Sequence, residues 1–386
     1  MTVLLGIVLL LVVLYNVTLY WETMALKNVT FTRSVDKMRV RIGDTVTLTT
    51  EVVNKKWLPL PWIAIHTPVP KVFQFKSSKL AARPEDDQLN FSIVTSLLFF
   101  EKVKRHDVFS CTARGYYSLY DFDVEIGDYF GFKKAKLKVK APMVVMVYPE
   151  ILPIKTLLLP MNSLMGEVSV KRWIVPDPLQ PVGTRPYTPL DSFNTIDWKA
   201  TARHAQMQVK QFDHTADPAI MVFLEVQSHV VHWQGRNEKA VERGIVIAAS
   251  LVDDALAQGI PIGLCHNALD MMGKSGTVIE PSASKKQRQS LLDALTLTTP
   301  HRGTDMGELL RHKAMNLGKE TVIVFIASFI TEAVFDTLGV MAREGYHIKL
   351  ISTDTMMRGT LSQLDHRIER LSVSDIVPVE RRVSGL

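Results

Sequence analysis

The hydrophobic period of this chain changes along its length, and the change separates two kinds of fold. From about Phe31 to Tyr148 apolar residues alternate with polar ones, as around Val46 and Leu48. A period of two is typical of strands with one buried and one solvated face. Turn residues such as Gly43-Asp44 separate these strands. We therefore predict an antiparallel β-sandwich domain over residues 28–150.

From Pro218 onward, short apolar runs alternate with helical patterns. Strands that alternate with helices predict a doubly wound, mainly parallel sheet, which makes residues 218–386 an α/β domain. The expected strands are 219–226, 260–265, 321–327 and 347–352, and the expected helices are 237–258, 286–295, 307–317 and 332–343.

Residues 151–217 form a proline-rich connector between these two domains. Its prolines exclude a long helix before Asn194. A short helix is expected at Ile196–His204, with Thr195 or Asp197 near its N-cap.

The first 21 residues contain no charged side chain, and Val3–Leu14 is apolar apart from one glycine. A membrane-spanning helix needs about 20 largely apolar residues. We therefore predict that Met1–Trp21 is an uncleaved transmembrane helix that belongs to neither domain, with Tyr20 and Trp21 at a membrane interface. A cleaved signal peptide is the alternative, but it would need a basic residue before the apolar run and a better cleavage site than Thr23-Met24-Ala25.

Basic residues predict the orientation of this helix. None precedes it, whereas Lys27, Arg33, Lys37, Arg39 and Arg41 follow it. The positive-inside rule then places a single-pass protein in the cell membrane, with its body in the cytoplasm and its N-terminus outside.

The cysteine content and the net charge agree with this location. Cys111 and Cys265 are far apart in sequence and are expected to be single thiols of a reducing compartment. The net charge of +6 favours a nearby anionic bilayer. Because the basic residues are scattered, we predict no nucleic-acid binding.

A polar motif lies within the connector. It consists of Arg185, Tyr187 and Asp191, followed by Ile196-Asp197-Trp198-Lys199-Ala200 and Ala202-Arg203. This motif resembles the signature of domain-of-unknown-function family 58. Arg114-Gly115-x-Tyr117, Asp128-Tyr129-Phe130-Gly131 and Val147-Tyr148-Pro149 resemble the family's landmarks in the β-domain. Leu190 and Asn194 depart from the usual pattern, which has glycine and arginine there.

The resemblance implies a membrane-anchored bacterial or archaeal protein with a von Willebrand factor A-type domain after Pro218. Members are commonly associated with MoxR-type AAA+ ATPases and sometimes with transglutaminase-like membrane proteins. The resemblance implies no defined enzymatic activity and no cofactor. Many members begin with a pair of membrane helices, whereas this sequence contains one candidate.

Von Willebrand A-type domains often hold a divalent cation on an Asp-x-Ser-x-Ser motif, a later threonine and a further aspartate. Here the first positions read Glu225, Gln227 and His229, and Thr304 matches the later threonine. Hard cations require converging carboxylate and hydroxyl oxygens. Because both serines and the later aspartate are replaced, we expect a degenerate site that binds no metal.

The helical part of the motif admits two interpretations. Lys199 and Arg203 are four residues apart on one helix face, Asp197 can cap the helix or pair with a base, and Trp198 is expected to be a buried apolar plate. One interpretation is an internal clamp between Asp197 and Arg203. The other is a docking surface, which we expect for Lys199 because its long side chain can reach outward.

Other chemical motifs are weak. Gly273-Lys274-Ser275 lacks the earlier glycine of a phosphate-binding loop and is expected to be a loop or hairpin. His204, His214, His229 and His232 show no metal-binding spacing, and no Gly-x-Ser-x-Gly elbow is present.

We therefore expect a membrane-anchored, non-enzymatic interaction module without catalytic residues. Its expected partners are the lipid bilayer and a MoxR-type ATPase or its client protein, in the assembly or maturation of that client. The first alternative is a metal-dependent binding or adhesion module that uses Glu225 and Thr304. The second is a hydrolase centred on Asp191, Asp197 and the nearby histidines.

Overall fold

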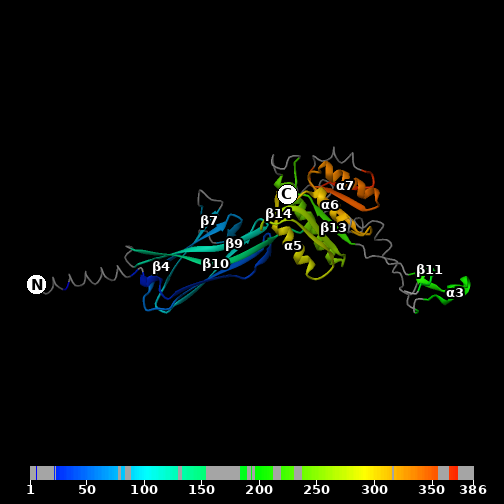
Figure 1. Cartoon of the computed structure of the whole chain (residues 1–386). Coiled ribbons are helices and arrows are strands. Elements are labelled where there is room, and N and C mark those ends of the chain that lie inside the picture. Colours follow the sequence, from blue (N-terminus) through cyan, green and yellow to red (C-terminus); the bar gives the residue numbers. More distant parts are fainter. Residues whose placement is uncertain are drawn as a thin grey trace. The chain divides into compact units, whose positions relative to one another are not determined.

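The computed structural model describes Gly6, Trp21 and residues 23–76, 80–82, 88–128, 133–153, 183–188, 193, 196–211, 219–229, 237–314, 317–354 and 365–372. The chain divides into two compact units, Met1–Glu150 together with Leu295–Leu297, and Ile151–Ala294 together with Thr298–Leu386. We call the first unit the β-domain and the part of the second unit from residue 219 onward the C-terminal domain. Figure 1 shows long strands in the β-domain and both helices and strands in the C-terminal domain.

The β-domain contains two sheets, with strand orders β1-β3-β8-β5 and β2-β10-β9-β4-β7-β6. Neighbouring strands are antiparallel, except that the short strand β2 pairs in parallel with β10. The strands are β1 (Val29–Val35), β2 (Arg39–Arg41), β3 (Thr45–Asn54), β4 (Leu60–Pro70), β5 (Phe73–Phe75), β6 (Leu80–Ala82), β7 (Gln88–Leu97), β8 (Lys102–Cys111), β9 (Gly115–Gly127) and β10 (Lys134–Tyr148).

One hydrophobic cluster joins the two sheets of the β-domain. Phe75 of β5 stacks on Phe91 of β7 with ring centroids 4.1 Å apart. Phe31 of β1 meets Phe122 of β9 edge-on at 6.4 Å. Each pair connects one sheet to the other, so the sheets bury their apolar faces against each other. This is the arrangement expected of a β-sandwich.

The residues before β1 differ from the expectation. Apart from Gly6 and Trp21, the predicted membrane helix Met1–Trp21 lies outside the described residues. Among the described residues, no helix is long and apolar enough to cross a bilayer. Trp21, which we expected at a membrane interface, is 5% exposed and belongs to the core of the β-domain together with the fully buried Ala25. The core of this domain therefore begins before residue 28.

The C-terminal domain is built on a sheet of order β15-β14-β13-β17-β18-β19, with β16 paired to β14. β13, β14, β17, β18 and β19 are parallel, whereas β15 and β16 are antiparallel to β14. Its elements are β13 (Ile220–Leu224), α4 (Glu238–Ala257), β14 (Ile262–Asp270), β15 (Ser275–Ser282), α5 (Gln287–Leu297), β16 (Thr298–Arg302), α6 (Met306–Ala314), β17 (Val322–Ala327), α7 (Glu332–Arg343), β18 (His347–Ser352) and β19 (Glu369–Ser372).

Helices cover both faces of the central strands. Phe223 of β13 belongs to one hydrophobic cluster with residues of α6 and α7. The next residue, Leu224, points the other way, toward Gly244 of α4. All described positions of β13 and β17 are buried, which explains why these strands are apolar throughout instead of alternating. The mainly parallel sheet predicted from the sequence is confirmed, with β15, β16 and β19 as additional strands that the sequence did not indicate.

Several local predictions can be compared directly. The predicted helix 332–343 and strand 347–352 coincide with α7 and β18. Asn237 caps α4, with its Oδ1 accepting a hydrogen bond from the backbone N–H of Ala240 at 3.1 Å. Cys111 and Cys265 are both buried and free, as expected of single thiols.

Candidate functional site

The connector motif folds into a small element that we call the motif module. It consists of β11 (Gly183–Pro186), α3 (Trp198–His204) and β12 (Gln208–Gln211), where β11 and β12 form an antiparallel pair. Ile196 makes an isolated bridge with Val209, and both side chains are buried. No residue of α3 is buried. The helix is therefore held mainly by hydrogen bonds.

Asp197 is the N-cap of α3. Its Oδ1 accepts a hydrogen bond from the backbone N–H of Ala200 at 3.0 Å. The Thr201 hydroxyl donates to the Asp197 carbonyl at 2.8 Å and accepts from the backbone N–H of Gln208 at 3.0 Å, which ties the helix to β12. The predicted cap is confirmed. Among the described residues no ion pair joins Asp197 to Arg203, so Asp197 stabilises the helix start itself.

The other motif side chains are exposed. Trp198, which we expected to be buried, is 68% exposed, and so is Phe193. Arg185, Lys199 and Arg203 are also exposed, and Asp191 lies outside the described residues. The motif module has only two large buried apolar side chains among its described residues. Such a small module, with a helix of seven residues, has no core that could bury an indole ring, and Trp198 is therefore exposed.

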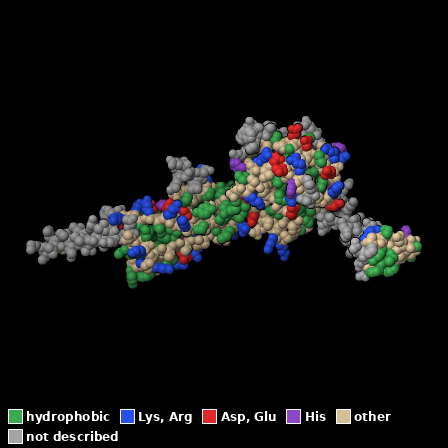
Figure 2. Space-filling model, viewed as in Figure 1, with side chains coloured by type: hydrophobic (Ala, Val, Ile, Leu, Met, Phe, Trp, Pro, Cys, Tyr) green, Lys and Arg blue, Asp and Glu red, His purple; other side chains and the backbone are tan. Residues whose placement is uncertain are grey.

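Exposed apolar groups gather on this module, as Figure 2 shows. Besides Trp198 and Phe193, Met207 is 43% exposed. The rings of Tyr187 and Phe193 lie 5.8 Å apart. Apolar surface beside exposed basic groups is typical of protein-binding surfaces, whose anchors are aromatic and arginine side chains.

The second candidate site lies at the carboxyl ends of the parallel strands. β13 pairs with β14 on one side and with β17 on the other. The strand order therefore reverses at β13, because β14 is added on one side of it and the later strands β17 and β18 on the other. Ligands of open α/β sheets bind at this position. Here Glu225 follows β13 and is 3% exposed. Its backbone N–H donates to the Ile326 carbonyl at 2.9 Å, which places it beside the end of β17.

The carboxylate of Glu225 is bound by neighbouring groups. Its Oε1 accepts hydrogen bonds from the backbone N–H of Gln227 at 2.8 Å and from Nδ2 of Asn267 at 2.6 Å. The Asn267 side chain also accepts from the backbone N–H of Val226 at 3.0 Å. Burial raises the pKa of Glu225 to about 7, and the two hydrogen bonds and the positive charge of Arg302 oppose this rise. Glu225 is therefore a buried acid at the edge of ionisation near neutral pH.

Arg302, at the end of β16, completes this group of residues. Its Nη1 donates to Oε1 of Gln227 at 2.7 Å, and its Nη2 contacts Oδ2 of Asp305 at 2.6 Å. Asp305 also accepts from the backbone N–H of Glu308 through its other oxygen at 3.0 Å. We call Glu225, Gln227, Asn267, Arg302 and Asp305 the sheet-edge network. Within this network the polar groups bind one another.

Sequence reasoning found Glu225, Gln227, His229 and Thr304 but missed Asn267, Arg302 and Asp305. Gln227 donates to the carbonyl of His229 at 2.8 Å, and Thr304 takes part through its backbone, which binds Asn267 and Arg302. Arg302 and Asp305 could have been proposed from the sequence, because both lie within two positions of Thr304. Asn267 had no signal, because it lies within an apolar strand.

The sheet-edge network does not fit a divalent cation. The guanidinium of Arg302 already supplies the positive charge that neutralises these oxygens, and both Glu225 Oε1 and Gln227 Oε1 accept hydrogen bonds from protein groups. A magnesium ion needs near-octahedral oxygen ligands and would be repelled by a guanidinium in this position. Among the described residues no group of three or more His, Cys, Asp or Glu side chains is placed to hold a metal ion.

Those of the remaining sequence candidates that the structure describes form no catalytic arrangement. His204 is exposed at the end of α3 and His229 is exposed after β13, while His214 and His232 lie outside the described residues. Gly273-Lys274-Ser275 forms the turn between β14 and β15, as predicted. Oδ1 of Asp270 accepts from the backbone N–H of Lys274 at 2.7 Å, which closes this turn instead of leaving its N–H groups for a phosphate.

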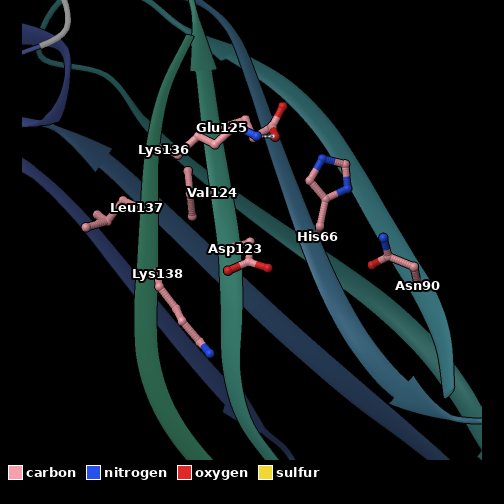
Figure 3. Close-up of a pocket in the computed structure, with 8 residues that line it drawn as sticks. All are labelled: His66, Asn90, Asp123, Val124, Glu125, Lys136, Leu137 and Lys138. Carbon is pink, nitrogen blue, oxygen red and sulfur yellow. Dashed lines mark ion pairs between the residues drawn. The ribbon is translucent and has the colours of Figure 1, made fainter. Parts of the chain in front are cut away.

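A polar groove of about 510 Å³ lies on the larger sheet of the β-domain. Figure 3 shows Lys136 of β10 reaching Glu125 of β9, with His66 of β4 nearby. The Lys136–Glu125 ion pair measures 2.9 Å, and its hydrogen bond is the main cause that lowers the pKa of Glu125. His66 in turn contacts the Ser92 hydroxyl at 2.8 Å. Ion pairs on an open sheet face stabilise weakly, so this groove is a solvated surface.

Comparison with known proteins adds a family for part of the chain. Residues 183–354 match the family described as "Protein of unknown function DUF58", which confirms the resemblance found in the motif. These residues contain both the motif module and the sheet-edge network. No curated protein matches the chain.

Solved structures give only distant likenesses. A non-cellulosomal cohesin from the archaeon Archaeoglobus fulgidus is 14% identical over 31% of this chain and 91% of its own, with a TM-score of 0.22. The major pilin SpaD from Corynebacterium diphtheriae is 14% identical over 31% of this chain, with a TM-score of 0.24. An alpha-2-macroglobulin from Escherichia coli is 13% identical over 32%, with a TM-score of 0.23. The chain spans 34% of that pilin and 24% of that macroglobulin structure, and these low TM-scores carry no functional argument.

Proposed function

We propose that this chain, whose residues 183–354 belong to the family of proteins of unknown function DUF58, is a membrane-anchored, non-enzymatic interaction module. The observation that supports this most directly is the exposure of the motif itself. Trp198 and Phe193 are each 68% exposed beside the exposed bases Lys199 and Arg203. A solvent-exposed tryptophan lowers solubility. Beside basic groups, it can serve as an anchor that a binding partner buries.

The family resemblance identifies the kind of partner. It implies a MoxR-type AAA+ ATPase or a client protein of such an ATPase, and we propose that the motif module contacts this partner in the assembly or maturation of the client at the membrane. We also propose that the C-terminal domain has a von Willebrand factor A-like fold and that the β-domain is a β-sandwich.

The membrane part of the proposal follows from the uncharged segment Met1–Trp21 and the basic residues after it. It places the body in the cytoplasm. Alkaline carbonate extraction of membranes tests it with the full chain and with a variant that lacks residues 2–20 and therefore keeps Trp21 in the β-domain core. Full chain in the pellet and the variant in the supernatant support the anchor. Both in the supernatant would exclude it.

Site-specific photocrosslinking in intact membranes tests the interaction surface. Benzoylphenylalanine at position 198 is compared with the same group at Val94, which is 46% exposed on the β-domain. We expect a crosslink to an AAA+ ATPase or its client at position 198 that weakens in Lys199→Ala and Arg203→Ala backgrounds. Equal products at both positions, or none at position 198, would contradict the proposal.

A metal-dependent binding module is the second candidate. One observation favours it: the hydroxyl of Ser328, just after β17, is buried and has no hydrogen-bond partner among the described residues. The guanidinium of Arg302 opposes it, because a like charge in the same network weakens cation binding. No contact between the described side chains favours the hydrolase.

A further inference from the structure

Two loops of the β-domain expose a group of large apolar side chains. Trp57, in the β3–β4 loop, is 77% exposed, and Leu98, Phe99 and Phe100, in the β7–β8 loop, are 60%, 52% and 57% exposed. The Trp57 ring stacks on Phe99 at 5.7 Å and meets Phe100 edge-on at 5.0 Å. We call these four residues the aromatic loop surface. The Trp57 ring contacts both phenylalanine rings, which joins two loops that are distant in sequence.

The backbone holds these loops in place beneath the rings. The buried side chain of Asn54 donates to the carbonyls of Leu58 at 2.9 Å and Leu98 at 2.8 Å. The backbone N–H of Phe100 donates to the Lys56 carbonyl at 3.3 Å. Phe100 adopts a positive φ of 50°, which is rare and unfavourable for an aromatic residue. Strained residues persist where surrounding contacts determine them and cluster at functional positions.

This surface lies beside residues 23–26, a short helical stretch that precedes β1. The ammonium group of Lys56, next to Trp57, donates to the carbonyls of Met24 and Lys27, each at 2.8 Å, and to that of Ala25. Burial lowers the pKa of Lys56 to about 8. Met24 is 55% exposed, and Lys27 and Lys55 are exposed. The apolar, uncharged run of residues 1–20 directly precedes this segment in sequence.

We propose that the aromatic loop surface inserts into the headgroup region of an anionic bilayer and holds the β-domain against the membrane. Tryptophan and phenylalanine rings settle at the interface, where exposed apolar area is removed from water. Lys27 and Lys55 supply the charge that anionic headgroups attract. The inference rests on the proposed membrane attachment and adds a second contact to it.

Lipid quenching of a fluorophore tests this placement in the full chain. A thiol-reactive fluorophore is attached to Trp57→Cys, and the matched control is Ile42→Cys. Ile42 precedes β3 and Trp57 follows it, and a strand of 10 residues separates them by about 30 Å. The native thiols Cys111 and Cys265 are buried and do not compete for the label. The vesicles contain phosphatidylcholine and phosphatidylglycerol, with bromines near the headgroup end of the acyl chains.

We expect the label at position 57 to lose most of its fluorescence in brominated vesicles and to resist iodide in the water, while the label at position 42 shows the reverse. Phe99→Cys provides a second position in case Trp57→Cys does not fold. If the chain floats with vesicles but position 57 is quenched by iodide alone, this proposal is wrong and the anchor stands. Failure to float overturns both.

Protection of position 57 from both quenchers, together with crosslinks between two copies at that position, would assign the surface to a second copy of the chain and contradict the bilayer. A further check omits phosphatidylglycerol, which we expect to reduce quenching at position 57, because the exposed lysines are attracted to an anionic surface.

Discussion

The sheet-edge network and the motif module differ in which kind of side chain they bury. The network buries a carboxylate, an amide and part of a guanidinium, and each of these groups is bound by a neighbour. The motif module leaves Trp198 and Phe193 largely in water and buries little. Buried polar groups that satisfy one another stabilise a fold, whereas exposed aromatic groups contribute little to it. We therefore expect the network to stabilise the C-terminal domain, and we propose the module as the surface that a partner covers.

The largest expected effect is in the network. Asn267→Ala removes the hydrogen bonds to Glu225 and to the backbone of Val226, which leaves the buried N–H of Val226 without its partner and the buried carboxylate of Glu225 with one hydrogen bond fewer. We expect the free energy of unfolding of the C-terminal domain to fall by about 4 kcal/mol. Denaturation of the full chain, with hydrogen exchange of β13 and β14 as the local measurement, checks this. Asn90→Ala, in the open groove of the β-domain, is the matched control and should change stability by about 0.5 kcal/mol or less.

The ionisation of Glu225 should make stability depend on pH. Its pKa is about 7 in the folded protein, against an ordinary value of 4.5. The folded state therefore holds a proton that the unfolded state releases between these values. Stability is greatest below the unfolded pKa and falls as the pH rises through the folded pKa, by up to about 3 kcal/mol. Melting of wild type and Glu225→Gln across this range tests it, since the amide cannot ionise. Parallel curves for the two proteins would show that Glu225 is not the group responsible.

A smaller effect is expected at the helix cap of the motif module. Asp197→Ala removes the acceptor for the backbone N–H of Ala200 and should destabilise α3 by about 1 kcal/mol. Faster hydrogen exchange within residues 198–204 would report this. Asp197→Asn keeps a capping oxygen and should exchange nearly as slowly as the wild type. Equal exchange in all three proteins would mean that Asp197 does not hold the helix start.

Exposed motif side chains should affect stability least and binding most. Trp198→Ala and Lys199→Ala should change the free energy of unfolding by about 0.5 kcal/mol or less, because neither side chain is buried. Lys199→Ala should weaken the crosslink from position 198, and Trp198→Ala should reduce capture of the partner by the full chain. Early melting of Trp198→Ala would show instead that the indole is covered within the chain, and the comparison between the two regions would then fail.

Magnesium should have no effect on the network. Ligands stabilise only the states that they bind, so millimolar magnesium should leave the melting temperature unchanged. Arg302→Met sharpens this test, because it removes the guanidinium that contacts Gln227 and Asp305. A shift that appears only in this variant would show that Arg302 occupies the position of a cation. A shift in the wild type that is lost in Glu225→Ala would favour the metal-dependent module.

Local sequence patterns predicted much of the fold because their causes are local. The alternation around Val46 and Leu48 requires a strand with one buried face, and the observed pattern of β3 follows it. The apolar face of residues 237–258 predicts α4 in the same way, and Asp197 could be assigned as a cap because an N-cap bonds the next turn. These features depend on residues within a few positions of one another.

Long-range contacts decided what the sequence could not. We expected Trp198 to be buried. Whether enough apolar side chains lie close to it to cover the ring depends on how the whole module folds. Trp21 was expected at a membrane interface and lies in the β-domain core. Asn267 reaches Glu225 across 42 positions and Arg302 reaches Gln227 across 75, so neither pair has a spacing that a motif could reveal. The sequence by itself determined the family motif, the helices and the central parallel strands β13, β14, β17 and β18 of the C-terminal domain. Only the tertiary structure decided which polar groups meet and which aromatic groups face water, because both depend on which distant segments the fold brings together.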